Sequence, residues 1–252
     1  MNVTSPFSFT PSPPLSQQPK PPQENFVKIV HDRDSSGHIV SISVTENQAD
    51  IRIKKELDGR LVAFINGRPH ALDVPNSGSS TLNITTGRYK DRITIDDDVR
   101  VTANVKSGAG DDFVQTGGGF ANVDTADGDD HVQLSTGGGY VKGGNGNDRL
   151  FAGSGKSELH GEGGENFFTT DIPTHNAGNT HIRSSGLRDT IFARAGEVDI
   201  EVRAGNAKIQ VNKEASVKIN LYSDSIGSEI TLKGRDTAAH ISKRTKTKLI
   251  RE

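Results

Sequence analysis

The sequence predicts an all-β protein built around a parallel, β-roll-like β-solenoid, with a small N-terminal β-hairpin module and a disordered, proline-rich leader before it. Three observations lead to this fold class. Glycine recurs every nine residues without a gap, and an apolar residue stands four positions after each of these glycines. Elsewhere apolar residues occur in short alternating runs, as in β-strands. No stretch of useful length has the period of an amphipathic helix.

The first 75 residues divide into two parts. Residues 1–25 contain seven of the ten prolines, mixed with serine and glutamine and with almost no charge, which is typical of a disordered leader. Residues 26–75 contain short alternating apolar runs separated by turn-forming pairs such as Asp58-Gly59 and Asn66-Gly67. This pattern predicts a small β module rich in hairpins. Residues 81–105 continue the strand signal as the first coils of the solenoid.

The nine-residue period occupies residues 106–169. Its glycines are Gly110, Gly119, Gly128, Gly137, Gly146, Gly155 and Gly164. The apolar residues that follow them are Val114, Val123, Val132, Val141, Leu150, Leu159 and Phe168. One such unit, a turn and a short strand, buries almost no apolar surface alone. Successive units are therefore expected to wind into stacked coils around a narrow shared interior.

A second period of eighteen residues is superimposed on the first. Two positions after alternate glycines stand Asp112, Asp130, Asp148 and Asn166, which we call the acidic rail. The intervening units have Ala121, Gly139 and Ser157 instead. If one coil contains two units, the acidic rail lies along one edge of the solenoid and the uncharged positions lie along the other.

A column of carboxylates at this spacing favours a divalent cation. Stacked strands lie about 4.8 Å apart, and like charges at that distance repel by about 1 kcal/mol in water and several times more at a protein surface. The potential ligands are carboxylate and carbonyl oxygens, with no Cys in the chain and no His in register. Such hard ligands suit Ca²⁺ better than Zn²⁺. We therefore expect Ca²⁺ as the cofactor.

These residues resemble the RTX repeat, the hemolysin-type calcium-binding nonapeptide of bacterial exported proteins, with the consensus G-G-x-G-x-D-x-U-x and U a large apolar residue. The segment from Gly143 to Phe151 fits every fixed position. The segments beginning at Ser107 and Thr125 lack the first glycine or the first two, and the segment beginning at Gly161 has Asn166 in place of the aspartate. The resemblance covers residues 106–169.

The resemblance implies calcium between stacked turns, held by aspartates of adjacent coils and by backbone carbonyls of the glycine-rich turn. It implies two ions, or three at most, between successive members of the acidic rail. The metal-binding residues carried over onto this sequence are Asp112, Asp130, Asp148, Asn166, Gly108, Gly110, Asp127, Gly128, Gly144 and Gly146.

After Thr169 the glycine period stops, and Pro173 and His175 indicate an interrupted coil. Apolar residues nine apart then resume at Ile182, Ile191, Ile200 and Ile209. Residues 178–234 are therefore predicted to continue the solenoid without metal, and residues 235–252 to form a basic tail.

The composition argues against several classes of function. The absence of Cys excludes disulfides and a cysteine nucleophile, and no run of 18 apolar residues predicts a membrane span. A formal net charge of -2 gives no bias toward nucleic acid. No HExxH, GxSxG or P-loop motif occurs, so we expect a protein that is not an enzyme. Asp124, Lys142 and His160, expected in one column, come nearest to a catalytic arrangement.

The leading hypothesis is a calcium-binding β-solenoid exported from a bacterium, secreted or injected into a host cell. It would be a monomeric, non-enzymatic binding or virulence module that folds when it meets calcium, with a host protein or glycan as its partner. A second hypothesis is an effector injected by the type III apparatus, whose solenoid binds a host target without calcium. A third is a carbohydrate-active enzyme of the lyase type built on a solenoid.

Overall fold

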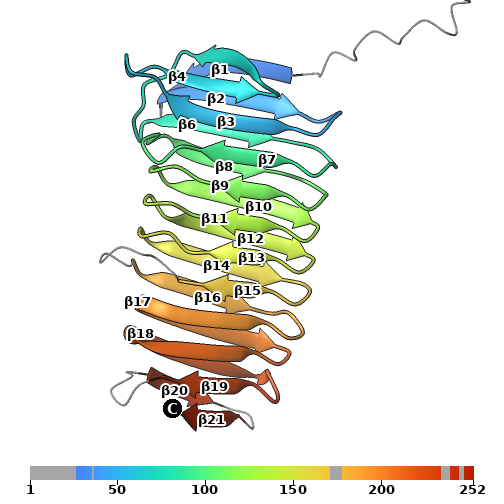
Figure 1. Ribbon diagram of the computed structural model, residues 1–252, viewed down its shortest axis with the longest axis vertical. Coiled ribbons are helices and arrows are strands. Elements are labelled where there is room, and N and C mark those ends of the chain that lie inside the picture. The colour runs from blue at the N-terminus through green and yellow to red at the C-terminus, as the bar shows by residue number, and fades with distance from the viewer. Residues whose placement is uncertain (1–26, 36, 171–177, 234–238, 244–246) are drawn as a thin grey trace, which may run out of the picture.

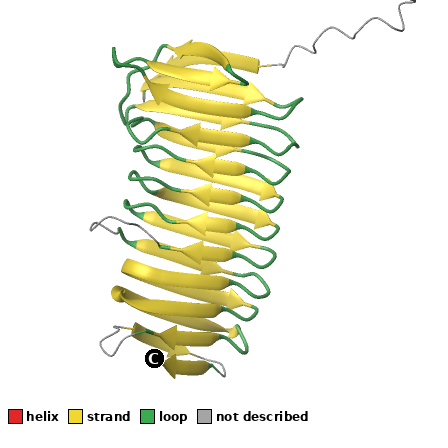
Figure 2. Cartoon of the chain, in the orientation of Figure 1, coloured by secondary structure: helices red, strands yellow, loops and turns green. Residues whose placement is uncertain are grey.

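The computed structural model describes residues 27–35, 37–170, 178–233, 239–243 and 247–252. It confirms an all-β solenoid, a long stack of coils (Figure 1). Every regular element in these ranges is a strand (Figure 2), and they contain no helix of the length and apolarity needed to cross a membrane. The predicted leader, residues 1–25, lies outside the described residues.

The coils form two parallel sheets that face each other across the interior. Sheet 1 contains β2 (Gly37–Val44), β6 (Ser80–Thr85), β8 (Thr102–Lys106), β10 (Ala121–Asp127), β12 (Gly139–Asn145), β14 (Ser157–Glu162), β16 (Thr180–Ser184) and β20 (Ala239–Lys243). Sheet 2 contains β3 (Asp50–Lys55), β7 (Arg92–Ile95), β9 (Phe113–Gln115), β11 (His131–Gln133), β13 (Arg149–Phe151), β15 (Phe167–Thr169), β19 (Glu229–Leu232) and β21 (Lys248–Arg251). Two long strands, β17 (Thr190–Ala204) and β18 (Lys208–Asp224), run through both sheets.

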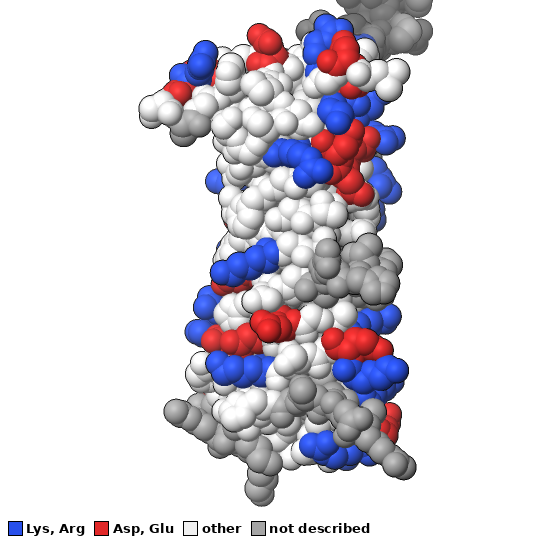
Figure 3. Space-filling model, turned by 90° about the vertical axis from the view of Figure 1, so that its left-hand side faces the viewer, with Lys and Arg blue, Asp and Glu red and all other residues white. Residues whose placement is uncertain are grey.

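The register confirms two nonapeptides per coil. Ala121 pairs with Gly139 in sheet 1, and Val132 pairs with Leu150 in sheet 2, in both cases eighteen residues apart. One edge therefore carries the turns from sheet 1 to sheet 2, including the acidic rail. The opposite edge is mostly uncharged, with scattered charged side chains (Figure 3). Ala121, Gly139 and Ser157 form a separate column at the start of the sheet 1 strands, as expected.

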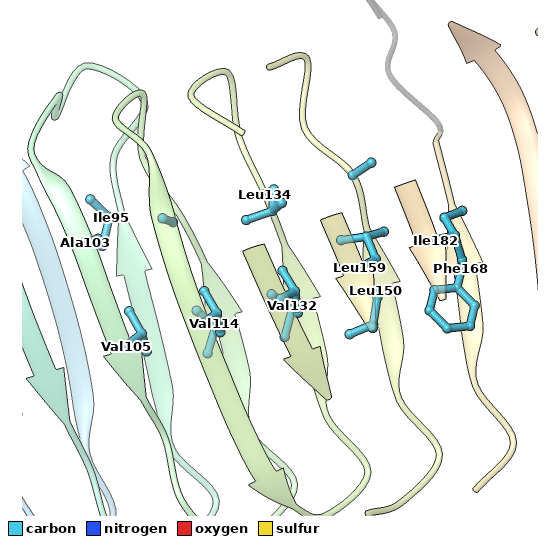
Figure 4. Close-up of a cluster of buried hydrophobic side chains, with 14 of the residues drawn as sticks. Ile95, Ala103, Val105, Val114, Val132, Leu134, Leu150, Leu159, Phe168 and Ile182 are labelled. Carbon is cyan, nitrogen blue, oxygen red and sulfur yellow. The ribbon is translucent and has the colours of Figure 1, made fainter. Parts of the chain in front are cut away.

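The core is the narrow space between the two sheets. Every apolar residue that the nine-residue period placed four positions after a glycine is buried, at most 1% exposed. Figure 4 shows several of them, among them Val132, Leu150 and Phe168, pointing into this space. Strand residues alternate between buried and exposed, as the period of two requires. Stacking of coils therefore supplies the burial that a single coil lacks.

The N-terminal segment is the first coil of the same solenoid with antiparallel strands added to it. Strands β2 and β3 pair in parallel with β6 and β7. Strand β1 (Val27–Asp34) pairs antiparallel with β2, and β4 (Leu61–Ile65) and β5 (Arg68–Leu72) extend β3 as a meander. These three strands lie at the N-terminal end of the stack (Figure 1). They give the first coil hydrogen-bonding partners on its outer side.

The solenoid continues to the end of the described chain. Ile182, Ile191, Ile200 and Ile209 are fully buried. Ser157 pairs with Thr180 rather than with residue 175, so this coil holds five extra residues; Pro173 and His175 lie outside the described residues. The basic segment 235–252, expected as a tail, instead contains β20 and β21, which pair with β18 and β19. Its few apolar residues, such as Ile241, are separated by basic ones, which hid the strand pattern.

One backbone position in each acidic turn has a left-handed conformation. It is Gly108, Ala126, Gly144 and Glu162 in successive coils, with φ of 98°, 67°, 113° and 62°. Only glycine adopts this region without a steric cost, which for other residues is about 1–2 kcal/mol. At Gly144 an added Cβ would lie 1.9 Å from the carbonyl oxygen of Ala126. The glycines of this column are therefore required by close coil stacking.

Ala126→Gly is expected to stabilise the protein and Gly144→Ala to destabilise it. Removing the left-handed strain of Ala126 gains about 1–2 kcal/mol, against about 0.5–1 kcal/mol for the freedom that glycine adds to the unfolded chain. Replacing Gly144 by alanine adds backbone strain of about 1–3 kcal/mol, together with the clash between the new Cβ and the Ala126 carbonyl. Urea unfolding of both variants at one calcium concentration measures this. Equal destabilisation by both changes would contradict the shared turn geometry.

Candidate metal centre

The acidic rail is one buried column, as the eighteen-residue period predicts. The structure also adds two members that the period missed. Asp91 precedes the rail and Asp189 follows it, so the extended rail runs Asp91, Asp112, Asp130, Asp148, Asn166, Asp189. All six side chains are buried, at most 2% exposed. Asp91 and Asp189 lie 21 and 23 residues from their neighbours in the rail, outside the strict eighteen-residue period. Each is followed two positions later by a buried isoleucine, just as Asp112 is followed by Val114, and this signal could have found them.

One oxygen of each rail side chain binds the backbone of the preceding coil. Asp130 Oδ1 accepts from the Asp112 N–H at 2.8 Å, and Asp148 Oδ1 accepts from the Asp130 N–H at 3.0 Å. The same bond joins Asp112 to Asp91, Asn166 to Asp148 and Asp189 to Asn166. At the start of the column Asp91 Oδ1 accepts from the Ala49 N–H at 2.6 Å. The side chains therefore link the coils in a continuous ladder of hydrogen bonds.

The second polar atom of each flanking member has a protein partner. Asp189 Oδ2 accepts from the Ser184 hydroxyl at 2.6 Å and from the Gly186 N–H at 3.1 Å. Asp91 Oδ2 accepts from the Gly87 N–H at 3.3 Å. Asn166 donates through Nδ2 to the Gly163 carbonyl at 2.9 Å. At these three positions the protein itself supplies a hydrogen-bond partner for the second polar atom of the side chain.

The three central members differ from the flanking ones. Oδ2 of Asp112, of Asp130 and of Asp148 is buried and makes no hydrogen bond. In the next coil the equivalent atom is the Asn166 amide, a donor to the carbonyl three residues earlier. By the same register the equivalent carbonyls are those of Ala109, Asp127 and Asn145. In the three aspartates a carboxylate oxygen, Oδ2, stands where Asn166 has an N–H donor. Two oxygens without a hydrogen between them repel each other, so this position needs either a proton on the carboxyl or a bound cation.

Burial raises the pKa of these three carboxyls. The pKa of Asp130 rises to about 7, and those of Asp112 and Asp148 rise to about 6, because desolvation penalises the ionised form. The backbone N–H bonds at Oδ1 oppose the shift in each case. The hydroxyls of Ser107 and Thr125 also oppose it, although neither makes a hydrogen bond of normal geometry to the carboxylate. The three central carboxyls therefore ionise at a higher pH than an ordinary aspartate does.

The turn glycines carried over from the resemblance surround the carboxylates. Gly108, Gly110, Gly128, Gly144 and Gly146 all have positive φ, between 98° and 137°. At Gly143 an added Cβ would lie 2.2 Å from Asp148 Oδ2, so glycine there makes room for the side chain. The Asp127 side chain is exposed and accepts from Asn145 Nδ2 at 2.8 Å, and the Asp127 backbone carbonyl accepts from the Gly110 N–H at 2.8 Å. A surface cavity of about 480 Å³ lies against Asp130 and Asp148.

This donor set fits a cation held by both side chains and backbone. Among the described residues no group of three or more His, Asp or Glu side chains is arranged to bind a metal. Each central coil contributes one buried, unpartnered Oδ2 atom next to a turn whose glycines have positive φ. Ca²⁺ accepts such mixed oxygen ligands in flexible geometry, whereas Zn²⁺ prefers nitrogen and sulfur. The arrangement fits calcium better than a transition metal.

Comparison with known proteins adds no assignment. No family model, no curated protein and no solved structure matches this chain. The resemblance to the RTX repeat therefore rests on the residues of the nonapeptide alone.

Proposed function

We propose that this chain is a non-enzymatic, calcium-binding β-solenoid whose central coils are stabilised by ions at the acidic rail. The observation that carries the proposal is the set of three unpartnered, buried Oδ2 atoms in consecutive coils. In the flanking coils the equivalent atom is hydrogen-bonded. Ser184 donates to Asp189, Gly87 donates to Asp91, and the Asn166 amide donates to a backbone carbonyl. A bound cation would give the unpartnered Oδ2 atom a partner at all three central positions.

Ionised carboxylates at these positions are costly without a cation. At pH 8 the pKa values of about 6 for Asp112 and Asp148 and about 7 for Asp130 leave all three carboxylates largely charged. They are buried and follow one another at the strand spacing of about 4.8 Å, so they repel one another in a medium less polarisable than water. Calcium between adjacent Oδ2 atoms would replace this repulsion by attraction. Metal binding would then contribute directly to folding.

This coupling supports a folding switch tied to export. Calcium is scarce in the cytosol, and extracellular calcium modules work with dissociation constants of about 10⁻⁴–10⁻³ M. A chain whose central coils are loose without calcium would pass a secretion channel unfolded and fold outside. We therefore propose export from a bacterium, and a binding or virulence role for the folded solenoid.

A calcium titration of the full chain tests the proposal. After EGTA treatment at pH 7.5, we expect calorimetry to show binding of two Ca²⁺ ions in the gaps on either side of Asp130. A third, weaker ion is expected if the gap beside Asn166 also binds. Circular dichroism should show a gain of β-structure on the same calcium scale. Magnesium should have little effect because it demands near-octahedral geometry and keeps its waters.

A folded apo protein that binds no calcium would contradict the proposal. The rail would then hold protons instead of ions, and the solenoid would act without metal, as expected for an effector that binds a host target inside a cell. Asp129→Asn provides a matched control for charge, because Asp129 is next to Asp130 in the same turn but exposed. Loss of calcium binding in this variant would place the ions outside the rail.

A further inference from the structure

The outer face of sheet 1 is a second polar surface, separate from the acidic rail. Two columns of outward side chains run along it, one position per coil. The first contains Asn83, Asn104, Asn122, Tyr140, Glu158, His181, Asp199 and Lys218. The second contains Thr85, Lys106, Asp124, Lys142, His160, Arg183, Glu201 and Asn220. Asp124, Lys142 and His160 thus share a column, as the sequence predicts.

Two cavities follow one another along these columns. The first, of about 530 Å³, is lined by residues of β6, β8, β10 and β12, including Asn104, Asn122 and Tyr140. The second, of about 710 Å³, is lined by residues of β14, β16, β17 and β18, including Glu158 and His181. Their linings adjoin where Tyr140 of the first pairs with Glu158 of the second, so the two cavities follow one another across successive coils as one surface. We call it the axial groove.

The charged side chains that line the two cavities balance in sign, with four lysines against four aspartates and glutamates, and several of the charged side chains on this face are paired. Arg183 lies 3.7 Å from Glu158 and 3.3 Å from Glu201, measured from guanidinium nitrogen to carboxylate oxygen. Lys142 Nζ lies 3.3 Å from Glu162, and Lys218 Nζ lies 3.6 Å from Asp199. The groove therefore presents little uncompensated charge with which to select an ionic ligand.

The asparagine column offers a regular series of hydrogen-bond donors. Asn83 donates to the Ser41 hydroxyl, Asn104 Nδ2 donates to Asn83 Oδ1 at 2.9 Å, and Asn122 Nδ2 donates to Asn104 Oδ1 at 2.9 Å. An amide carries two N–H groups, and this ladder uses one from each residue. Within the described part of the chain, each asparagine keeps a second N–H for a ligand. The donors recur once per coil, at about 4.8 Å.

His160 is held between two neighbouring side chains of the groove. Its Nε2 lies 2.7 Å from Glu158 Oε1, and its Nδ1 lies 3.3 Å from the Tyr140 hydroxyl. Both ring nitrogens are therefore engaged within the groove. The same contacts hold Tyr140 at the end of the asparagine column, with its ring centroid 4.9 Å from that of His160. The position of the Tyr140 hydroxyl in the groove is therefore fixed by its neighbours.

The outer face of sheet 2 carries a row of aromatic side chains where sheet 1 carries polar ones. Neighbouring rings in this row contact one another. The rings of Phe113 and His131 stack with centroids 5.1 Å apart, and those of Phe167 and Phe192 are tilted with centroids 5.4 Å apart. This face offers ring surfaces and edges in place of a column of amide donors. Sheet 2 therefore provides a reference surface on the same molecule.

We propose that the axial groove binds a linear, uncharged polysaccharide lying along the solenoid axis. Donors that recur once per coil match a ligand that repeats its own hydroxyl groups along its length. The small uncompensated charge favours a neutral polymer over a uronate polymer or a nucleic acid. The hollow surface extends over several coils, so a chain of several sugar units would contact it.

Affinity electrophoresis in native gels tests this, with hydroxyethylcellulose and mixed-linkage β-glucan as neutral probes and polygalacturonate as the acidic one. The gels contain calcium, and each protein is shown to be folded by circular dichroism. We expect both neutral polymers to retard the protein more than polygalacturonate does. Asn104→Ala combined with Asn122→Ala should weaken retention at least tenfold. Gln115→Ala combined with Gln133→Ala, on sheet 2, should leave it unchanged.

Tyr140→Phe provides a second measurement, because it removes one hydroxyl from the groove and leaves the ring that packs on His160. A loss of several-fold in retention is expected. Absence of retention by both neutral polymers would overturn the proposal, as would stronger retention by polygalacturonate or equal losses from the sheet 1 and sheet 2 pairs. The sites lie on different surfaces, so calcium binding can fail while glycan binding holds, and the reverse.

Discussion

The combined replacement of Asp112, Asp130 and Asp148 by asparagine is expected to abolish calcium binding and to make the solenoid fold without calcium. Asn166 is the natural precedent, because its Oδ1 keeps the bond to the Asp148 N–H while its Nδ2 donates to the Gly163 carbonyl. Three amides would make both contacts and carry no charge. At pH 8 without calcium, the free energy of unfolding should rise by at least about 3 kcal/mol, the value of two pKa units at one carboxylate.

Calorimetry and urea unfolding, each with EGTA and with calcium, measure this result. Wild type should gain stability from calcium, and the triple variant should not. The single variant Asp129→Asn is the control, since it removes an exposed charge from the same turn and should respond to calcium like wild type. A triple variant that still binds calcium would show that the ligands lie elsewhere. One that is less stable than the calcium-free wild type would show that the Oδ2 atoms do not face acceptors.

Without calcium, the stability of the wild-type protein is expected to fall as the pH rises from 5 to 8. Burial raises the folded-state pKa of Asp130 to about 7 and those of Asp112 and Asp148 to about 6, whereas an unfolded aspartate has a pKa of about 3.9. The folded protein therefore holds protons that the unfolded chain has lost. Their contribution is complete below about pH 4 and is lost as the pH passes through the folded values. At about 1.4 kcal/mol per unit, the total loss is several kcal/mol.

Urea unfolding at pH 5, 6, 7 and 8 in EGTA checks this dependence. His131 acts in the opposite direction, because burial lowers its pKa and protonation of this residue therefore opposes folding. It is one group against the three central carboxyls and Asp189, whose pKa burial also raises. Saturating calcium should flatten the curve, since the ion takes the place of the protons. The triple asparagine variant should lose most of this dependence in either condition, with Asp189 and His131 left as groups whose pKa values burial shifts. A calcium-free wild type that gains stability toward pH 8 would show that the rail is not the dominant titrating element.

Much of the fold could be predicted because the nine-residue period encodes it locally. A glycine at the turn and an apolar residue four positions later fix which side chains point inward, and the eighteen-residue period fixes the coil. Asp91 and Asp189 escaped this reasoning because coils of 21 and 23 residues shift them out of phase. Strands β20 and β21 escaped it because basic side chains separate their few apolar residues.

The bonding within the rail could not be predicted from the sequence. The period places Asp112, Asp130 and Asp148 in a column but does not indicate which oxygen meets a backbone N–H. That depends on the turn backbone, where Gly143 makes room for the Asp148 carboxylate. The difference between central and flanking members also depends on single residues outside the repeat, such as Ser184. Only coordinates could separate satisfied oxygens from unsatisfied ones.

The rail bonds have a direction, since each carboxylate accepts from the amide of the coil before it. During synthesis on the ribosome, the turn of one coil is completed only when the following coil has emerged. A chain shortened from its C-terminal side would leave a backbone amide donor at the new end, whereas one shortened from its N-terminal side would leave a carboxylate acceptor there. The two ends of the solenoid are therefore chemically different, and loss of neighbouring coils exposes a different group at each.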